Sequence, residues 1–265
     1  MPFTLCHPAI VIPLHRCARG VTSLPALVIG SMMPDFVYFF AFGVSGRFSH
    51  SVSGILLYCV PVGALVYLLY YALLRQAFLA WLPQALSARM AWQIPMPFPG
   101  ARAAWVALLS LAIGASTHIA WDAFTHPGTL LVNHFGLARA LASIGGHDIP
   151  VFKVLQHMSS LIGFLVIASC TAAWVLRSQP GPAYPLSLSN RQRVLVLAMV
   201  GAAAVAGSAA GLLLRHATTL ERGLFNAITT GMASAAMAVV LLCVGWKAWA
   251  HHRIEKSRHV RQAGE

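Results

Sequence analysis

The feature that most constrains this chain is a set of five apolar segments, each about as long as the roughly 20 residues that a spanning helix needs. Backbone polar groups find no hydrogen-bond partners in lipid, so segments this apolar cross a membrane as helices. The segments are residues 53–74, 103–124, 155–176, 194–214 and 224–248. The sequence therefore predicts an all-α fold, a polytopic integral membrane bundle with about five spanning helices.

The composition excludes an ordinary soluble domain. Hydrophobic residues make up 58% of the chain and charged residues only 9%, against about 25% charged residues in soluble domains. A net charge of +12 in a soluble protein would suggest nucleic-acid binding. Here the basic residues lie between the apolar segments and in the tail, where they anchor spans to anionic head groups. We expect membrane lipids as partners and no nucleic acid.

A sixth apolar stretch, residues 24–42, is interrupted by Pro25, Gly30, Pro34 and Asp35. Proline and glycine end or break helices, so we interpret this stretch as a broken, interfacial or re-entrant element. It completes an N-terminal membrane domain at residues 1–177. We assign loops to residues 75–102, 125–153 and 177–193.

Residues 178–265 hold the last two spans and a basic tail. Gly207 and Gly211 form a GxxxG pair in an alanine-rich helix, and such small residues let helices approach closely. This face could pack against another helix of the same chain or against a second copy of the protein. The sequence is therefore compatible with a homo-oligomer.

The basic residues predict the orientation. Eleven of the 18 Lys and Arg residues lie on the side that carries the tail, and basic residues concentrate in the cytoplasm. We expect a multi-pass membrane protein with its tail in the cytoplasm. If residues 24–42 cross fully, the N-terminus changes side.

A carboxylate inside an apolar helix is the first indication of chemistry. Asp122 lies near the end of the second span, where an unpaired aspartate is costly. His118, Asp122 and His126 follow at intervals of four residues, which places them on one helical face. An imidazole and a carboxylate one turn apart can bind one divalent cation. The alternative is a hydrogen-bonded His–Asp pair that orders the helix end.

Further candidate ligands belong to the same side of the bundle. His50 precedes the first span, and His157 opens the third. In an up-down bundle these positions share a membrane face with the end of the second span. His7 and Asp35 join them if the N-terminal element does not cross. Taken singly, each histidine could be a hydrogen-bonded interfacial residue, and Asp35 could belong to a Pro-Asp turn.

Nitrogen and oxygen ligands without thiolates favour zinc, manganese or iron. The five cysteines form no CxxC pair, so neither a thiolate zinc site nor a disulfide framework is expected. We therefore predict a divalent metal, zinc first and manganese or iron as alternatives. The predicted ligands would suffice for two metals; they are His7, Asp35, His50, His118, Asp122 and His157.

Several motifs resemble a known family. They are MPFTLCHPAIVIPLHR, LVIGSMMPDFVYF, FSHSVSGILLYCVPVG, STHIAWDAFTHPG and IPVFKVLQHMSSLIG. In this order they look like bacterial domain-of-unknown-function family 4184, over about residues 1–240. That resemblance implies a membrane fold, a location in the bacterial inner membrane and no established activity.

The N-terminal His, PD, SH and HxxxD pattern also resembles, more distantly, the membrane-bound metal-dependent hydrolases and the zinc-dependent phospholipase C sites. That resemblance implies His7, Asp35, His50, His118 and Asp122 as ligands. The phospholipase pattern has a later HxxxE, whereas Leu161 stands four residues after His157. The resemblance therefore does not extend to a three-metal phospholipase site.

Two classes of function follow from these residues. The first is a metal-dependent hydrolase acting on a lipid or lipid-linked phosphate or ester at the membrane surface, with His126 donating a proton or orienting the water. The second is a non-enzymatic membrane protein whose His/Asp cluster is a structural metal site, a hydrogen-bonded group, or part of an ion or proton pathway.

Overall fold

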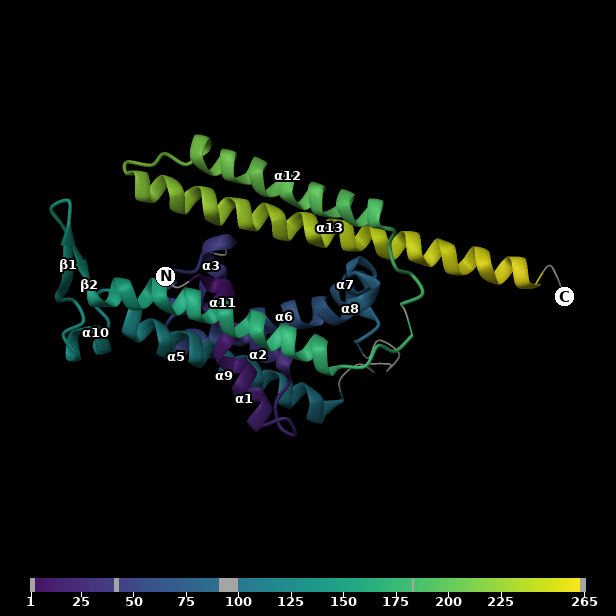
Figure 1. Cartoon of the computed structure of the whole chain (residues 1–265), viewed down its shortest axis with the longest axis horizontal. Helices are drawn as coiled ribbons and strands as arrows, with labels where there is room; N and C mark the ends of the chain where they lie inside the picture. The colour runs from purple at the N-terminus through teal and green to yellow at the C-terminus, as the bar shows by residue number, and fades with distance from the viewer. Residues whose placement is uncertain (1–2, 41–42, 91–99, 183, 263–265) are drawn as a thin grey trace. The chain divides into compact units, whose positions relative to one another are not determined.

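The computed structural model describes residues 3–40, 43–90, 100–182 and 184–262, which are predominantly helical (Figure 1). The chain divides into two compact units. The first comprises Met1–Tyr67 and Met96–Arg177, and the second comprises Leu68–Pro95 and Ser178–Glu265.

Five helical segments of the described chain are long and apolar enough to cross a membrane, which confirms the predicted polytopic bundle. The shortest has 25 residues. It therefore extends about 37 Å at about 1.5 Å per residue, more than a hydrocarbon core of about 30 Å. The segments are Val52–Trp81, Ala101–His134, Val151–Arg177, Asn190–Leu214 and Leu220–Lys256.

The first of these segments is continuous but not uniform. It comprises α5 (Val52–Gly54), α6 (Val60–Leu69) and α7 (Arg75–Trp81), joined by π-helical turns at Ile55–Cys59 and Tyr70–Leu74. The loop predicted from residue 75 is therefore wrong at its start, because α7 continues the span and α8 (Gln84–Ser87) follows. Residues 91–99 of that loop lie outside the described residues.

The remaining long helices are regular. They are α9 (Ala101–Thr125), α11 (Val151–Arg177), α12 (Asn190–Leu214) and α13 (Leu220–Gln262).

The N-terminal region is made of short pieces, as its prolines predict. A 3-10 turn (Thr4–Cys6) leads into α1 (Pro8–Cys17). The apolar stretch at residues 24–42 is broken into α2 (Leu24–Gly30), a 3-10 turn (Met33–Asp35) and α3 (Phe36–Phe39), with residues 41–42 outside the described part. A further short helix, α4 (Gly46–Ser49), precedes the first span.

Two glycines allow α2 to approach α9 at backbone distance. A Cβ on Gly30 would collide with the carbonyl oxygen of Leu111, and one on Gly114 would collide with that of Leu27. Because neither residue carries a side chain, Ser31 and the turn after α2 lie directly against the helix that carries the HxxxD motif.

The segment assigned to a loop at residues 125–153 contains structure that was not predicted. It holds α10 (Leu130–His134) and a two-stranded antiparallel hairpin of β1 (Ala140–Ile144) and β2 (His147–Pro150). The strands are joined by Gly145 and Gly146, with φ of 60° and 79°. Two consecutive positive φ angles are the requirement of the tight hairpin turn.

In the second unit, α12 packs against α13 through the predicted small-residue face. Added Cβ atoms would collide with Ser234 at Gly207 and with the backbone of Asn226 at Gly211. The GxxxG pair therefore mediates helix packing within the chain. The second unit also has a hydrophobic core to which α7, α13 and the segment that precedes α12 contribute. Its buried residues are Ala77, Leu79, Ala80, Tyr184, Leu188, Cys243, Trp246 and Ala250.

Candidate metal centre

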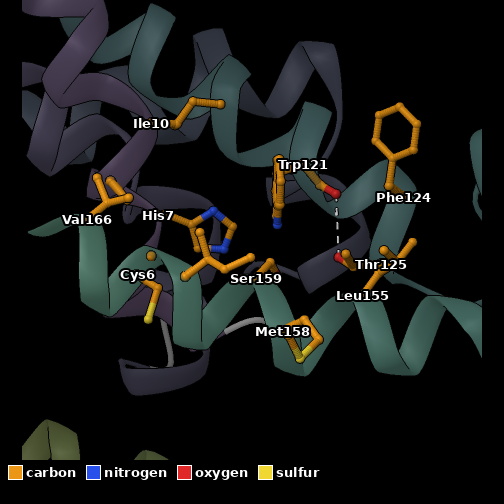
Figure 2. Close-up of a pocket in the computed structure, with 13 residues that line it drawn as sticks. Cys6, His7, Ile10, Trp121, Phe124, Thr125, Leu155, Met158, Ser159 and Val166 are labelled. Carbon is orange, nitrogen blue, oxygen red and sulfur yellow. Dashed lines mark hydrogen bonds between the residues drawn. The ribbon is translucent and has the colours of Figure 1, made fainter.

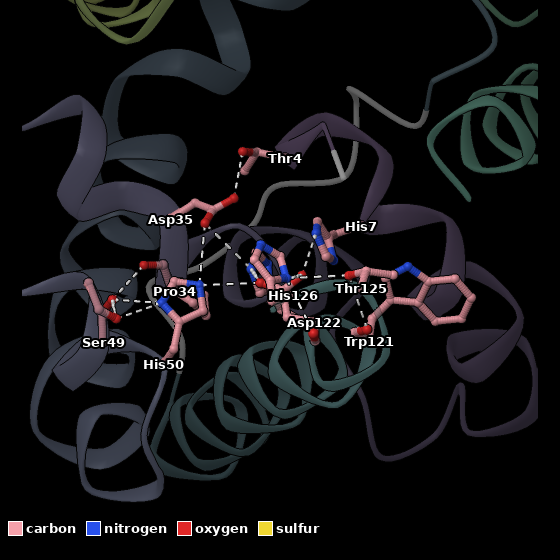
Figure 3. A network of polar contacts seen from close by, with 12 residues as sticks. Thr4, His7, Pro34, Asp35, Ser49, His50, Trp121, Asp122, Thr125 and His126 are labelled. Atoms are coloured by element: carbon pink, nitrogen blue, oxygen red, sulfur yellow. Dashed lines mark hydrogen bonds and ion pairs between the residues drawn. The ribbon is translucent and has the colours of Figure 1, made fainter. Parts of the chain in front are cut away.

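Four possible metal ligands converge inside the first unit (Figure 3). Asp35 ends the turn after α2, His50 follows α4, and His118 and Asp122 lie one turn apart on α9. One ligand atom from each lies within 4.8 Å of all the others. Asp35 and His118 are fully buried and Asp122 is 5% exposed. The close approach of α2 to α9 brings the Asp35 carboxylate near the Asp122 carboxylate.

Each imidazole contacts both carboxylates at nearly equal distances. His50 Nε2 lies 3.4 Å from Asp35 Oδ1 and 3.5 Å from Asp122 Oδ2. His118 Nε2 lies 3.6 Å and 3.3 Å from the same two oxygens. These distances exceed the hydrogen-bond range of about 2.7–3.2 Å. Two ligands on a tetrahedral cation with bonds of about 2.0–2.1 Å are about 3.3 Å apart, so the four His–Asp distances are compatible with a shared cation.

The backbone orients both imidazoles. The Nδ1 of His118 lies 2.7 Å from the carbonyl oxygen of Ser31, and the Nδ1 of His50 lies 2.8 Å from that of Gly46. A carbonyl oxygen only accepts hydrogen bonds, so each Nδ1 carries the proton and donates it. In the neutral ring, Nε2 then directs its lone pair at the carboxylates. Metal-binding histidines are commonly held in this way by a hydrogen bond from the other ring nitrogen.

Several buried polar atoms of this region lack a hydrogen-bond partner. Thr4 Oγ1 donates to Asp35 Oδ2 at 2.6 Å, so one oxygen of that carboxylate is satisfied. Asp35 Oδ1 and His118 Nε2 are not satisfied by any hydrogen bond. Buried polar atoms are nearly always paired, and a lone pair facing a carboxylate is repulsive without a proton or a cation between them. A divalent cation satisfies both atoms at once, and the residues present fit it.

The pKa shifts of His50 and Asp35, which lie outside the spanning segments, agree with a cation at this position. Burial lowers the pKa of the His50 imidazole, but the carboxylates of Asp122 and Asp35 outweigh it and raise the pKa to about 9. Burial raises the pKa of Asp35, but the imidazoles of His118 and His50 hold it well below its usual range. Both shifts show that the two carboxylates attract positive charge.

The second oxygen of Asp122 faces two further histidines. His126 Nδ1 lies 3.4 Å from Asp122 Oδ1, and His7 Nε2 lies 3.9 Å from it. The His7 ring also stacks on the His118 ring with centroids 3.7 Å apart. Burial and the neighbouring His118 lower the pKa of His7 to about 4, so His7 is neutral at pH 7. Both histidines border the four-ligand group, and neither is a member of it.

The structure does not bring His157 into this group. Its side chain is exposed on α11, whereas Gln156 is 4% exposed and points inward. Neighbouring positions of a helix differ by about 100° in direction, so the inward position falls one residue earlier. Sequence reasoning also missed Thr4 and the carbonyl groups of Ser31 and Gly46. Hydroxyl and backbone groups occur throughout the chain, so no sequence signal could have found them.

Comparison with known proteins identifies a family. No curated protein and no solved structure matches the chain. A family model described as "Domain of unknown function (DUF4184)" matches residues 1–244, which include all four possible ligands and both bordering histidines. The chain therefore belongs to the DUF4184 family of domains of unknown function.

Proposed function

We propose that this protein is a membrane-bound, metal-dependent hydrolase that acts on a lipid or lipid-linked phosphate or ester at the membrane surface. The observation that carries the proposal is the convergence of two oriented imidazoles and two carboxylates beside the end of a spanning helix. The His50 side chain is 19% exposed, so the cluster can be reached from outside.

The donor set supports zinc, with manganese or iron as alternatives. Two imidazole nitrogens and two carboxylate oxygens are a ligand set that suits zinc. His118 and Asp122 would hold the cation from α9, while Asp35 and His50 would hold it from the opposite side. When bound, such a cation lowers the pKa of a water to about 7 and polarises a phosphoryl or acyl oxygen.

His126 is placed to handle the proton of the leaving group. It lies at the end of α9, its side chain is 25% exposed, and its Nδ1 faces Asp122 Oδ1. In the proposed reaction, the oxygen of water bonds to phosphorus or to the acyl carbon, and the ester bond breaks. The departing oxygen takes its proton from His126, and a proton from the water restores the imidazole.

One observation favours the rival reading of a structural metal site. Four protein ligands are the usual number in closed structural zinc sites, whereas catalytic sites use three and keep a position open. An ion or proton pathway has less support. Among the described residues, every buried histidine or carboxylate belongs to or borders the cluster; these are His7, Asp35, His118 and Asp122. A pathway would need such groups at several depths.

The proposed function also includes a membrane location and an orientation. The five apolar helices support a multi-pass membrane protein, and we propose that the membrane is the bacterial inner membrane. We propose that the tail lies in the cytoplasm and that the metal centre faces the opposite side.

Hydrolysis by the purified protein tests the proposed activity. Zinc-loaded wild type in mixed micelles should release phosphate from hexadecyl phosphate or fatty acid from a lysophospholipid. His126→Ala should lower the turnover by about 100-fold, the smaller end of the effect of a general acid, and should keep the metal. His157→Ala is the matched control and should change neither. Metal-loaded protein that hydrolyses no phosphate or ester lipid would leave the structural site as the better explanation.

A further inference from the structure

A cavity of about 540 Å³ lies between the N-terminal segment, α9 and α11 (Figure 2). This volume is in the range of about 300–1,000 Å³ that small-molecule sites occupy. The walls are mostly apolar, and the largest side chains lining it are Ile10, Trp121, Phe124, Leu155, Met158 and Ile162.

One end of the cavity is a wall of the candidate metal centre. His7 lines the cavity, and the same side chain stacks on His118 and faces Asp122. Trp121 and Thr125 line it from α9, on either side of Asp122 in the sequence. The apolar space therefore ends at the His7 imidazole, which separates it from the ligand cluster.

The other walls belong to helices long and apolar enough to lie in a bilayer. Leu155, Met158 and Ile162 on α11 are 40%, 49% and 54% exposed, so the cavity that they line is partly open to its surroundings. No Asp, Glu, Lys or Arg is among the described residues that line the cavity. These walls suit a hydrocarbon chain and offer nothing to a charged head group. The charge complementarity lies at the metal-centre end, where a divalent cation would attract an anionic group.

We infer that this cavity holds one hydrocarbon chain of a long-chain phosphate ester, with the phosphate at its His7 end, beside the metal centre. The inference rests on the proposed function and names its substrate class: an amphiphile that binds by its chain inside the protein. Linear alkyl and isoprenoid chains share this chemistry.

Photolabelling tests the cavity directly. The probe is a hexadecylphosphonate with a diazirine at mid-chain, whose carbon–phosphorus bond resists hydrolysis. In wild type, labelled peptides should map to cavity residues of α9 and α11. Met158→Trp fills the cavity and should lower this labelling by about tenfold, since a close-packed site does not admit both groups. Leu161→Trp is the matched control on the same helix, 54% exposed and outside the lining, and should label like wild type.

Competition identifies the chain. Excess hexadecyl phosphate or farnesyl phosphate should displace the probe, and the stronger competitor distinguishes a linear from an isoprenoid chain. Inorganic phosphate at the same concentration should not displace it. Displacement by inorganic phosphate would overturn the inference, and so would equal labelling of lipid-facing positions in all three proteins. If Met158→Trp does not fold, Leu155→Trp fills the cavity from one turn earlier.

Bound metal measured in the same samples separates the two proposals. Specific cavity labelling in a protein that binds no metal would refute the hydrolase and keep the chain site. Unspecific labelling in a protein with stoichiometric metal would refute the chain site alone. We expect Met158→Trp to keep its metal while losing the label.

Discussion

Replacing Asp122 with Asn is expected to lower the metal affinity of the purified protein by well over 100-fold. Asp122 Oδ2 contacts both imidazole nitrogens of the cluster at 3.3 Å and 3.5 Å. The amide keeps the size of the side chain but removes its charge. Loss of a group that merely supports a ligand costs about 10–100-fold, so loss of a ligand itself should cost more. Titration of chelator-treated protein with zinc measures the change.

The chain offers a matched control for this substitution. Asp148 lies in β2 with an exposed side chain, so Asp148→Asn removes the same charge away from the cluster. It should leave zinc affinity unchanged. If Asp122→Asn binds zinc as tightly as wild type, Asp122 is not a ligand, and a hydrogen-bonded His–Asp pair becomes the better explanation.

His118→Ala is expected to cost about 2–5 kcal/mol of unfolding free energy even without metal, the range of large-to-small core substitutions. The imidazole is fully buried, stacks on His7 and donates to the carbonyl oxygen of Ser31. Its removal leaves a cavity and a buried carbonyl without its partner. Unfolding in detergent with a chelator present measures the loss without a contribution from bound metal.

An exposed histidine provides the comparison for that measurement. His157→Ala changes a solvent- or lipid-exposed position of α11 and should stay within about 0.5 kcal/mol of wild type. A His118→Ala variant as stable as wild type would mean that the imidazole does not join α2 to α9.

Much of the site could be predicted from the sequence because charge is costly in an apolar setting. Asp35 and Asp122 each interrupt an apolar stretch, so each required a partner. His118 could be predicted as the partner of Asp122 from their four-residue spacing. His50 required the additional assumption of an up-down bundle, since only topology brings it to the end of α9. The same assumption also placed His157 among the predicted ligands. An up-down arrangement does not determine which residue of α11 points inward.

The remainder depended on contacts that leave little trace in a single sequence. The approach of α2 to α9 rests on Gly30 and Gly114, and glycine is common throughout the chain (21 residues). Thr4 reaches Asp35 across 31 positions, which no local pattern indicates. Gly145 and Gly146 are a recognised hairpin turn signal, but the runs on either side, ALASI and HDIP, contain few of the β-branched and aromatic residues that strands favour. The two glycines alone therefore do not predict a hairpin.

The most direct test of the central claim is X-ray absorption spectroscopy on detergent-purified wild type, with metal content determined on the same sample. We expect one divalent metal per chain at the four-ligand group, zinc first, in a shell of imidazole nitrogen and carboxylate oxygen at about 2.0–2.2 Å. Sulfur should be absent from that shell, since no cysteine belongs to the four-ligand group. Protein that stays metal-free after incubation with zinc, manganese and iron, or a shell containing sulfur, would contradict a metal centre formed by Asp35, His50, His118 and Asp122.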